Sequence, residues 1–288
     1  MNKRLLSVLA LLFTLGLVAA ACGDDDSTST GSDGGGVSGG EDGMTDLGGR
    51  EVTIAVENAY LPFNYLDPET GDPTGWDYEV LDELCSRLNC VPKYENFPWE
   101  PMIQAVSDGQ FDMAADGITI TEDRAEIVDF SEGYINIDQR ILVRIDEDRF
   151  ADETEFAAGD FVLATQIGTT NYDTAVELVG DDRIRTFEEF GFVVESVLNG
   201  DVDGAIVDET AGQGYIGENA DQLKLVGSSL SSDQLGFIFG LGSDLVAPFN
   251  EALASMKADG SLEEISGRYF GDSFTISYDD IEFPTYEE

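Results

Sequence analysis

One arginine of the sequence stands where local helix preferences would place an acid. Residues 117–124 read Gly-Ile-Thr-Ile-Thr-Glu-Asp-Arg and follow an apolar run, which predicts a short helix with Thr121 as its N-cap. Arg124 is then the third helical residue, where a glutamate would complete a capping box and suit the positive helix end. Its planar guanidinium, beside free backbone N–H groups and the hydroxyls of Thr119 and Thr121, fits a carboxylate. We therefore expect an anion site around Arg124, with a solvated surface arginine as the alternative.

An aspartate marks a second place for ligand chemistry. Asp208 ends the apolar run at residues 205–207, and open α/β sheets bind ligands at the carboxyl edge of their strands. The alternative is that Asp208 only caps the following helix. The Gly-Thr-Thr-Asn turn at residues 168–171 offers further backbone N–H groups, or is a plain connection. Four aromatic residues lie in or next to loop segments, where they either pack or contact a ligand: Tyr60, Phe63, Trp99 and Tyr134.

The composition excludes several function classes. The 288 residues carry 59 Asp and Glu against 14 Lys and Arg, a formal net charge of −45. Such a chain repels phosphate backbones, because nucleic-acid affinity comes mainly from Lys and Arg, so we expect no nucleic-acid partner. The sequence has no histidine, which removes His-based nucleophile pairs and imidazole metal sites. We expect no metal and no cofactor, and the hydrophobic content of 42% is enough for a packed core.

The N-terminus has the pattern of an export signal. Two cations precede an apolar run over residues 5–18, which ends in three alanines directly before Cys22. This arrangement resembles the lipobox of bacterial lipoproteins, in which the cysteine is lipidated and becomes the mature N-terminus. We expect a signal peptide at 1–21, a lipid anchor on Cys22 and a flexible acidic Gly/Ser linker at 22–49. Ordinary secretion with Cys22 as a bystander is the alternative.

Export leaves two further cysteines in an oxidising compartment. Cys85 and Cys90 form an even pair, so we expect a disulfide between them rather than two buried thiols. Four intervening residues are too many for one helix face, so the helix must stop between the cysteines. Asn89 tolerates a left-handed backbone and sits where that stop is needed.

Strand-like and helix-like segments alternate from Arg50 onward, which predicts an α/β fold with mainly parallel sheet. Residues 51–56 and 161–165 are predicted strands. Two predicted helices have apolar stripes at helical spacing: Tyr78, Leu81, Leu84, Cys85 and Leu88 in one, and Phe187, Phe190, Val194, Val197 and Leu198 in the other.

One pattern occurs twice and predicts two similar lobes. Residues 106–112 and 197–203 each end an amphipathic helix with a glycine and enter an apolar strand. A strand at 138–145 leaves the first lobe, and an alternating run at 235–241 returns to it. Two such crossings make a hinge with a cleft. We expect the following limits: lobe 1 at 50–140 with 236–271, lobe 2 at 141–235, and an acidic C-terminal tail at 272–288.

Taken in order, these segments resemble the extracytoplasmic solute-binding proteins of polar amino-acid ABC transporters, family 3. The resemblance covers about residues 50–271. It rests on residues 59–63 (Ala-Tyr-Leu-Pro-Phe), 75–77 (Gly-Trp-Asp), 117–124 with 128–131, 166–170, 203–208 and 258–261. The resemblance implies the two-lobed periplasmic-binding-protein fold of type II, with two hinge strands and a ligand cleft between the lobes.

The resemblance also implies roles for particular residues. In this family the arginine of the Thr-x-x-Arg segment clamps the α-carboxylate, the aspartate that ends the second lobe's strand pairs with the α-ammonium, and aromatic residues sandwich the side chain. By motif position the implied ligand-binding residues are Arg124 with Gly117 and Thr119, Asp208, Tyr60 with Trp99, and Thr170.

Two acids add negative charge near the expected cleft. Glu57 stands where family members often carry an aspartate that contacts the ligand side chain, and Asp116 stands where a small residue is usual. Because Arg124 is the only cation among the assigned residues, we expect an amino acid or amine with a cationic or amide side chain to bind best. Alternatively, Glu57 or Asp116 pairs with Arg140 or Arg144 inside a lobe.

The expected protein is a binding protein rather than an enzyme. It would be a membrane-anchored, extracytoplasmic monomer that captures a polar amino acid and delivers it to the permease subunits of an ABC importer. An enzyme of the same fold, resembling cyclohexadienyl or arogenate dehydratases, is one alternative, with a cleft carboxylate as acid or base. A ligand-sensing receptor module is the other.

Overall fold

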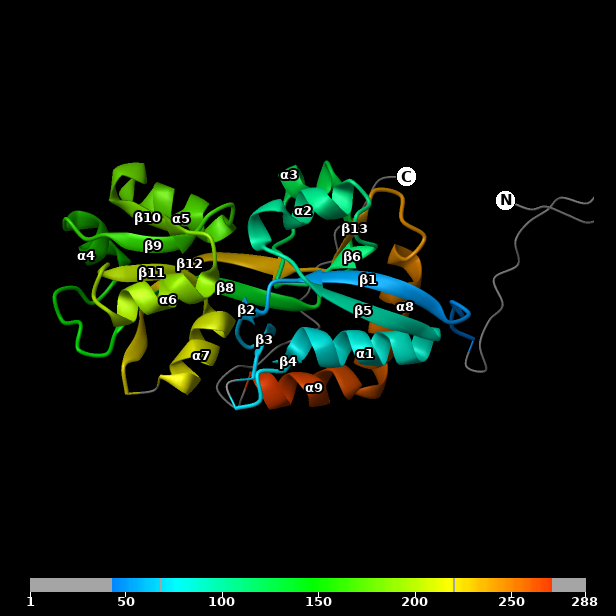
Figure 1. The fold of residues 1–288 in the computed structure, drawn as a ribbon. Coiled ribbons are helices and arrows are strands. Elements are labelled where there is room, and N and C mark those ends of the chain that lie inside the picture. Colours follow the sequence, from blue (N-terminus) through cyan, green and yellow to red (C-terminus); the bar gives the residue numbers. More distant parts are fainter. Residues whose placement is uncertain (1–42, 68, 220, 271–288) are drawn as a thin grey trace, which may run out of the picture. The chain divides into compact units, whose positions relative to one another are not determined.

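The computed structural model describes residues 43–270 except residues 68 and 220. The expected signal peptide, Cys22 and the expected tail at 272–288 lie outside these residues. Within them, two five-stranded sheets and one three-stranded sheet alternate with helices (Figure 1), which confirms the predicted α/β class. The prediction of a mainly parallel sheet was wrong, because half of the strand pairings in the two large sheets and all of those in the small sheet are antiparallel.

The first sheet has the strand order β5-β1-β6-β13-β7. Strand β1 runs parallel to β5 and β6, and β13 is antiparallel to β6 and β7. Alternation along β1 places Val52 and Ile54 in the cluster that contains α1, and Ala55 in the cluster that contains α2, so both faces are buried. The strands span Arg50–Val56 (β1), Cys90–Asn96 (β5), Met113–Ala114 (β6), Val128–Phe130 (β7) and Ile238–Gly240 (β13).

Five helices pack around the first sheet, and we call this assembly the first lobe. Helices α1, α8 and α9 pack against one another (Figure 1), while α2 and α3 contact the strands at the other end of the sheet. A small sheet, β2-β3-β4, packs against α1. The helices are Trp76–Leu88 (α1), Trp99–Ser107 (α2), Glu122–Ala125 (α3), Val246–Asp259 (α8) and Ser261–Tyr269 (α9); the small strands are Ala59–Tyr60 (β2), Asn64–Leu66 (β3) and Pro73–Thr74 (β4).

The second sheet has the order β10-β9-β11-β8-β12, and with its helices it forms the second lobe. Strand β9 is parallel to β10 and β11, and β8 is antiparallel to β11 and β12. Its strands span Ile135–Arg144 (β8), Leu163–Gln166 (β9), Ile184–Phe187 (β10), Gly204–Asp208 (β11) and Leu223–Leu235 (β12). Its helices span Glu153–Ala158 (α4), Thr170–Val179 (α5), Phe190–Leu198 (α6) and Glu209–Glu218 (α7), with a 3₁₀ turn at Asp181–Arg183.

Two neighbouring strands carry the chain between the lobes. Leaving β7, the chain enters β8, and it returns from β12 into β13, with Leu235 of β12 paired to Ile135 of β8. The pairing confirms the predicted pair of crossings. The expected lobe limit at residue 140 falls inside β8, all of whose partners belong to the second sheet.

The two repeated helix ends have the same backbone. Helix α2 is followed by Gly109 with φ of 72°, and α6 is followed by Gly200 with φ of 74°. Residues other than glycine rarely adopt this backbone conformation. Both predicted stops are therefore confirmed. Phe187, however, belongs to β10 rather than to the stripe of α6.

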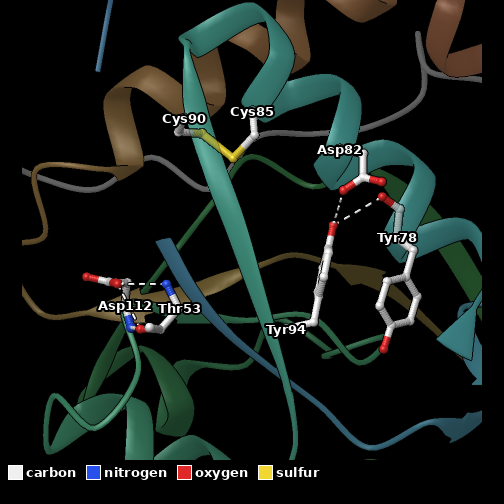
Figure 2. The surroundings of a disulfide bond; sticks show 7 residues. All are labelled: Thr53, Tyr78, Asp82, Cys85, Cys90, Tyr94 and Asp112. Atoms are coloured by element: carbon white, nitrogen blue, oxygen red, sulfur yellow. Dashed lines mark hydrogen bonds between the residues drawn. A yellow bond between two sulfur atoms is a disulfide. The ribbon is translucent and has the colours of Figure 1, made fainter. Parts of the chain in front are cut away.

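A disulfide joins the end of α1 to the start of β5 (Figure 2). Cys85 and Cys90 are bonded, with their Cα atoms 4.6 Å apart. Asn89 between them has a left-handed backbone, φ 51° and ψ 53°, which confirms the predicted stop. Further along β5, the Tyr94 hydroxyl lies within hydrogen-bond distance of Asp82 (2.8 Å) and of the Tyr78 carbonyl (3.2 Å), both in α1, so the disulfide is not the only tie between these described elements.

Candidate functional site

One cavity brings together every residue that the sequence analysis assigned to ligand binding. It lies between the facing ends of the two sheets, and its empty space of about 340 Å³ includes the part that opens to solvent. The lining residues are Glu57, Tyr60, Trp99, Asp116, Gly117, Thr119, Arg124, Gln166, Thr169, Thr170, Asn171, Phe190 and Asp208.

At one end of the cavity the guanidinium of Arg124 is held in place. Thr121 caps α3 as predicted, because its hydroxyl accepts from the Arg124 backbone N–H at 3.2 Å. The Nη1 atom donates to the Thr119 carbonyl at 2.8 Å, and the guanidinium carbon lies 5.3 Å from the centre of the Trp99 ring. These contacts fix the plane of the guanidinium fork and stack one face on an aromatic ring.

The charge of Arg124 is not neutralised by a direct partner. Within the part of the chain that the structure describes, its side chain donates only to the carbonyls of Thr119 and Gly168. Burial lowers its pKa to about 10, and the more distant charges of Asp208, Asp173 and Asp233 oppose that shift. Since about 10 is far above neutral pH, the guanidinium remains charged. A partly buried cation with free hydrogen-bonding capacity is suited to an anionic ligand group.

Across the cavity, Asp208 ends β11 at the carboxyl edge of the second sheet. Its side chain makes no capping hydrogen bond to α7, so the capping alternative does not describe it. Instead the Tyr60 hydroxyl donates to Oδ2, and the Asn171 amide donates to Oδ1 at 3.0 Å. Burial raises its pKa to about 6, although both hydrogen bonds lower it. Asp208 is therefore mainly ionised at neutral pH and can accept from an ammonium group.

A second pair of acids lies in the same cavity. Glu57 follows β1 and accepts from the Gln166 amide at 2.6 Å, and Asp116 follows β6 and accepts from the Asn64 amide at 2.8 Å. Burial raises the pKa of both carboxyls, and the charge of Asp116 raises that of Glu57 further. No cation of the described residues lowers either pKa.

The alternative partners proposed for these acids are engaged elsewhere. Arg140 pairs with Glu209 at 2.9 Å, and Arg144 donates to the carbonyls of Val197 and Val202. Glu57 and Asp116 therefore face the cavity without a paired arginine, which leaves this end of it acidic.

The same Asn64 amide connects Asp116 to a fully buried acid behind the cavity. Its nitrogen also donates to Asp77 Oδ2 at 2.8 Å. The other Asp77 oxygen has no hydrogen-bond partner among the described residues, and burial raises the Asp77 pKa to about 8. The sequence analysis quoted Asp77 only as part of the Gly-Trp-Asp turn and assigned it no role.

Small residues and hydroxyls complete the walls. Thr119 and Thr170 face each other with their hydroxyls 3.3 Å apart, and the Gln139 amide donates to Thr170 at 2.9 Å. Gly117 has φ of +57°, and a Cβ there would lie 2.4 Å from the Tyr60 ring. Only glycine allows Tyr60 to pack this closely.

Four lining residues were not assigned from the sequence. Gln166, Thr169 and Asn171 belong to or adjoin the Gly-Thr-Thr-Asn turn, whose position between strand and helix was the available signal. Phe190 was read as part of an apolar helix stripe, which does not distinguish core from cavity. Phe63 and Tyr134, in contrast, are fully buried and do not line the cavity.

The described residues hold no cluster of three or more metal-ligating side chains. Over the same part of the chain, no helix combines the length and hydropathy needed to cross a bilayer.

Comparisons with known proteins agree with this architecture. Among curated proteins, the L-cystine-binding protein TcyA of Bacillus subtilis (strain 168) is 26% identical over 275 residues, covering 94% of this chain and 98% of its own. The arginine-, lysine-, histidine-binding protein ArtJ of Geobacillus stearothermophilus superposes with a TM-score of 0.72 at 28% identity, over 77% of this chain and 95% of its own.

A third relative bears on the enzyme alternative. The ancestral amino acid-binding protein AncCDT-1, described as a precursor of cyclohexadienyl dehydratase, superposes with a TM-score of 0.71 at 28% identity, over 76% of this chain and 95% of its own.

The sequence model of the bacterial extracellular solute-binding proteins, family 3, matches residues 52–272, which is most of the chain. The match confirms the resemblance drawn from the ordered motifs. This chain belongs to the bacterial extracellular solute-binding proteins of family 3.

Proposed function

We propose that this protein captures a free polar amino acid with a cationic or amide side chain by closing its two lobes, and delivers it to the permease of an ABC importer. The observation that carries the proposal is the separation of charge within the cavity. Arg124 is a cation without a paired carboxylate. The same cavity contains four side chains that accept hydrogen bonds from side-chain amides and not from a cation: Asp208, Glu57, Asp116 and Thr170.

Each group of such a ligand has a matching partner. The α-carboxylate binds the guanidinium fork of Arg124, beside the Thr119 and Thr170 hydroxyls. The α-ammonium binds Asp208, which sits on the opposite lobe from Arg124. Because the two groups of one ligand then bridge the two lobes, binding favours the closed arrangement.

The side chain of the ligand meets the acidic end of the cavity. Glu57 and Asp116 accept hydrogen bonds from an amine, guanidinium or amide, and Trp99 and Tyr60 supply ring faces for its stem. Burial keeps much of this acid pair protonated while the site is empty, and no cation lies at this end of the described lining. A carboxylate side chain would therefore lack a positive partner, and any acid that remains ionised would add a like-charge contact that costs several kcal/mol. The proteins compared above are named for cystine, arginine, lysine and histidine, which are all polar amino acids.

A thermal-shift screen of the purified protein against all amino acids tests the ligand class. A ligand at a hundredfold excess over its Kd adds about 2.7 kcal/mol to the free energy of unfolding, which is readily seen. Competition calorimetry at moderate ionic strength then ranks arginine, lysine, glutamine and glutamate. Tighter binding of glutamate than of arginine would contradict the proposed charge of the cavity.

A second function is supported by the protonation of the same acids. Burial raises the pKa of Asp116 to about 7 and that of Glu57 to about 9, and a raised pKa is a property of carboxyls that act as general acids or bases. The likeness to a dehydratase precursor points the same way. Turnover of a prephenate-like acid by the purified protein would establish this activity, and its absence in a protein that binds amino acids would exclude it.

We further propose that the mature protein is extracytoplasmic, in the periplasm or at the cell surface, and is anchored to a membrane through a lipid on Cys22. Support comes from the sequence alone: the three alanines before Cys22 and the Gly/Ser/Asp linker after it. Cys22→Ser is expected to move the protein from the membrane fraction to the soluble fraction. Unchanged membrane association would exclude the lipid anchor.

A further inference from the structure

Helix α7 contains three glycines with very different surroundings. Glycine in a helix interior costs about 1 kcal/mol relative to alanine, so three in ten residues call for a packing reason. A Cβ on Gly212 would lie 3.0 Å from Val207 and Leu225, which belong to the second lobe itself. A Cβ on Gly217 would meet nothing within 4 Å. Gly212 therefore lets α7 approach its own sheet, and Gly217 faces open space.

Gly214 has a different neighbour, the backbone of the first lobe. A Cβ there would lie 3.1 Å from the carbonyl carbon of Leu61 and 3.1 Å from the nitrogen of Pro62. These atoms follow β2 in the first lobe and cannot move aside as a flexible side chain could. A side chain at this position would therefore press on that backbone, and α7 and the first lobe would have to move apart by a few tenths of an ångström.

The next residue adds a hydrogen bond between the same two segments. Tyr215 is buried, and its hydroxyl donates to the Ala59 carbonyl at 2.6 Å. Its ring lies 5.6 Å from that of Phe190, which in turn meets Tyr60 edge-on at 4.9 Å. Neither Gly214 nor Tyr215 lines the cavity. The contact therefore joins the lobes beside the ligand site and is connected to it through packed rings.

We propose that Gly214 and Tyr215 form a closing contact that positions the lobes around the ligand and so sets its affinity without touching it. The inference rests on the proposed capture of an amino acid by lobe closure. The apparent Kd equals the intrinsic Kd divided by the fraction of protein in the binding-competent state. Weakening the contact lowers the closed fraction, so it weakens every ligand by one common factor and speeds dissociation.

The test compares two variants with two matched controls. Tyr215→Phe removes only the hydroxyl, and Gly214→Ala adds only the methyl group that faces the first lobe. Tyr172→Phe is the control for the hydroxyl, because that hydroxyl donates to Asp181 within the second lobe at 2.6 Å. Gly217→Ala is the control for the methyl group, because it changes helix propensity alone.

Affinities and dissociation rates are measured for arginine and glutamine with each protein. Tyr215→Phe is expected to weaken both ligands about 3- to 10-fold, the effect of one lost hydrogen bond, mainly through faster dissociation. Gly214→Ala should weaken both more strongly, and the melting temperatures of the ligand-free variants should stay close to those of their controls. Affinities within twofold of the control, or a loss confined to one ligand, would overturn the closing contact. A wild-type protein that binds no amino acid would overturn the proposed function itself, and this role with it.

Discussion

The Tyr60 hydroxyl of the first lobe donates a hydrogen bond to Asp208 Oδ2 of the second lobe, directly across the cavity. With Asn171 on the other oxygen, Asp208 has a donor on each side. A carboxylate held in this way keeps its orientation when a ligand arrives, and its remaining lone pairs can accept from an ammonium group. The pair Tyr60–Asp208 thus holds the acceptor in place from both lobes.

Asp208→Asn is expected to lower the affinity for every α-amino acid about 100-fold or more, because a buried charged hydrogen bond is replaced by a neutral one. Isothermal titration calorimetry measures the loss. Tyr60→Phe is the companion variant: it keeps the ring and the charge of Asp208 and removes only one donor, so a loss of about tenfold or less is expected. Equal losses for both variants would show that Asp208 does not bind the ammonium group.

Arg124→Ala is expected to lower affinity by a similar or larger factor while the far-UV spectrum stays unchanged. The variant removes a charged fork and leaves the ligand carboxylate desolvated without a partner. Arg124→Lys keeps the charge but not the fork, so it should recover only part of the loss. The control is Arg185→Ala, at an exposed arginine that donates to the Asp201 carbonyl. An affinity of Arg124→Ala within threefold of wild type would exclude the carboxylate role.

How much the sequence predicted depended on whether a residue departed from local rules. Arg124 was found because its charge opposes the start of its own helix, and Asn89 because a helix had to end between two cysteines. Phe190 was missed because a cavity-facing aromatic on a helix stripe has the same spacing as a core residue. Asp77 was missed because an acid in the first helical turn is normally solvated and stabilising. Its complete burial depends on segments distant in the sequence, which local patterns do not contain.

The disulfide is expected to contribute to stability and not to binding. Replacing both cysteines with serine reopens a short loop, which costs about 2 kcal/mol in the chain-entropy model. The Tyr94–Asp82 hydrogen bond and the pairing of β5 with β1 remain to hold the segment (Figure 2). Chemical denaturation should show the lower free energy of unfolding, while calorimetry gives the wild-type Kd. A changed Kd would show that the α1–β5 turn is coupled to the cavity.

Asp77 predicts a decline of stability with rising pH. Its pKa is raised from 3.8 to about 8 in the folded protein, so between these values the folded state holds a proton that the unfolded state has lost. The stability from this group is therefore complete below about pH 4 and is lost as the pH rises toward 8. Asp77→Asn keeps an acceptor for Asn64 and cannot ionise, so it should remove this part of the decline. The free energy of unfolding of wild type relative to the variant should fall by about 1.4 kcal/mol per pH unit across the window. A pH-independent difference would show that Asp77 is ionised in the folded state.

The acidic end of the cavity predicts that selectivity itself depends on pH. Glu57 faces Asp116, Glu189, the Gln166 amide and the backbone N–H of Trp99, and its pKa is raised first by burial and then by the charge of Asp116. At pH 6 its carboxyl is therefore largely protonated in the ligand-free protein. A guanidinium beside it stabilises the ionised form, so arginine binding releases a proton and its affinity rises with pH.

The ratio of arginine affinity to glutamine affinity isolates this effect, because both ligands place the same ammonium group on Asp208. Between pH 6 and pH 8 the ratio should increase, by at most about tenfold per pH unit for each proton released. In Glu57→Gln the ratio should be smaller and nearly constant, with a remaining slope from Asp116, whose pKa is also raised by burial. Calorimetry in two buffers of different ionisation enthalpy counts the released protons directly. A wild-type ratio that does not change over this range would mean that the ligand side chain lies away from Glu57, and that the selectivity of the cavity is set elsewhere.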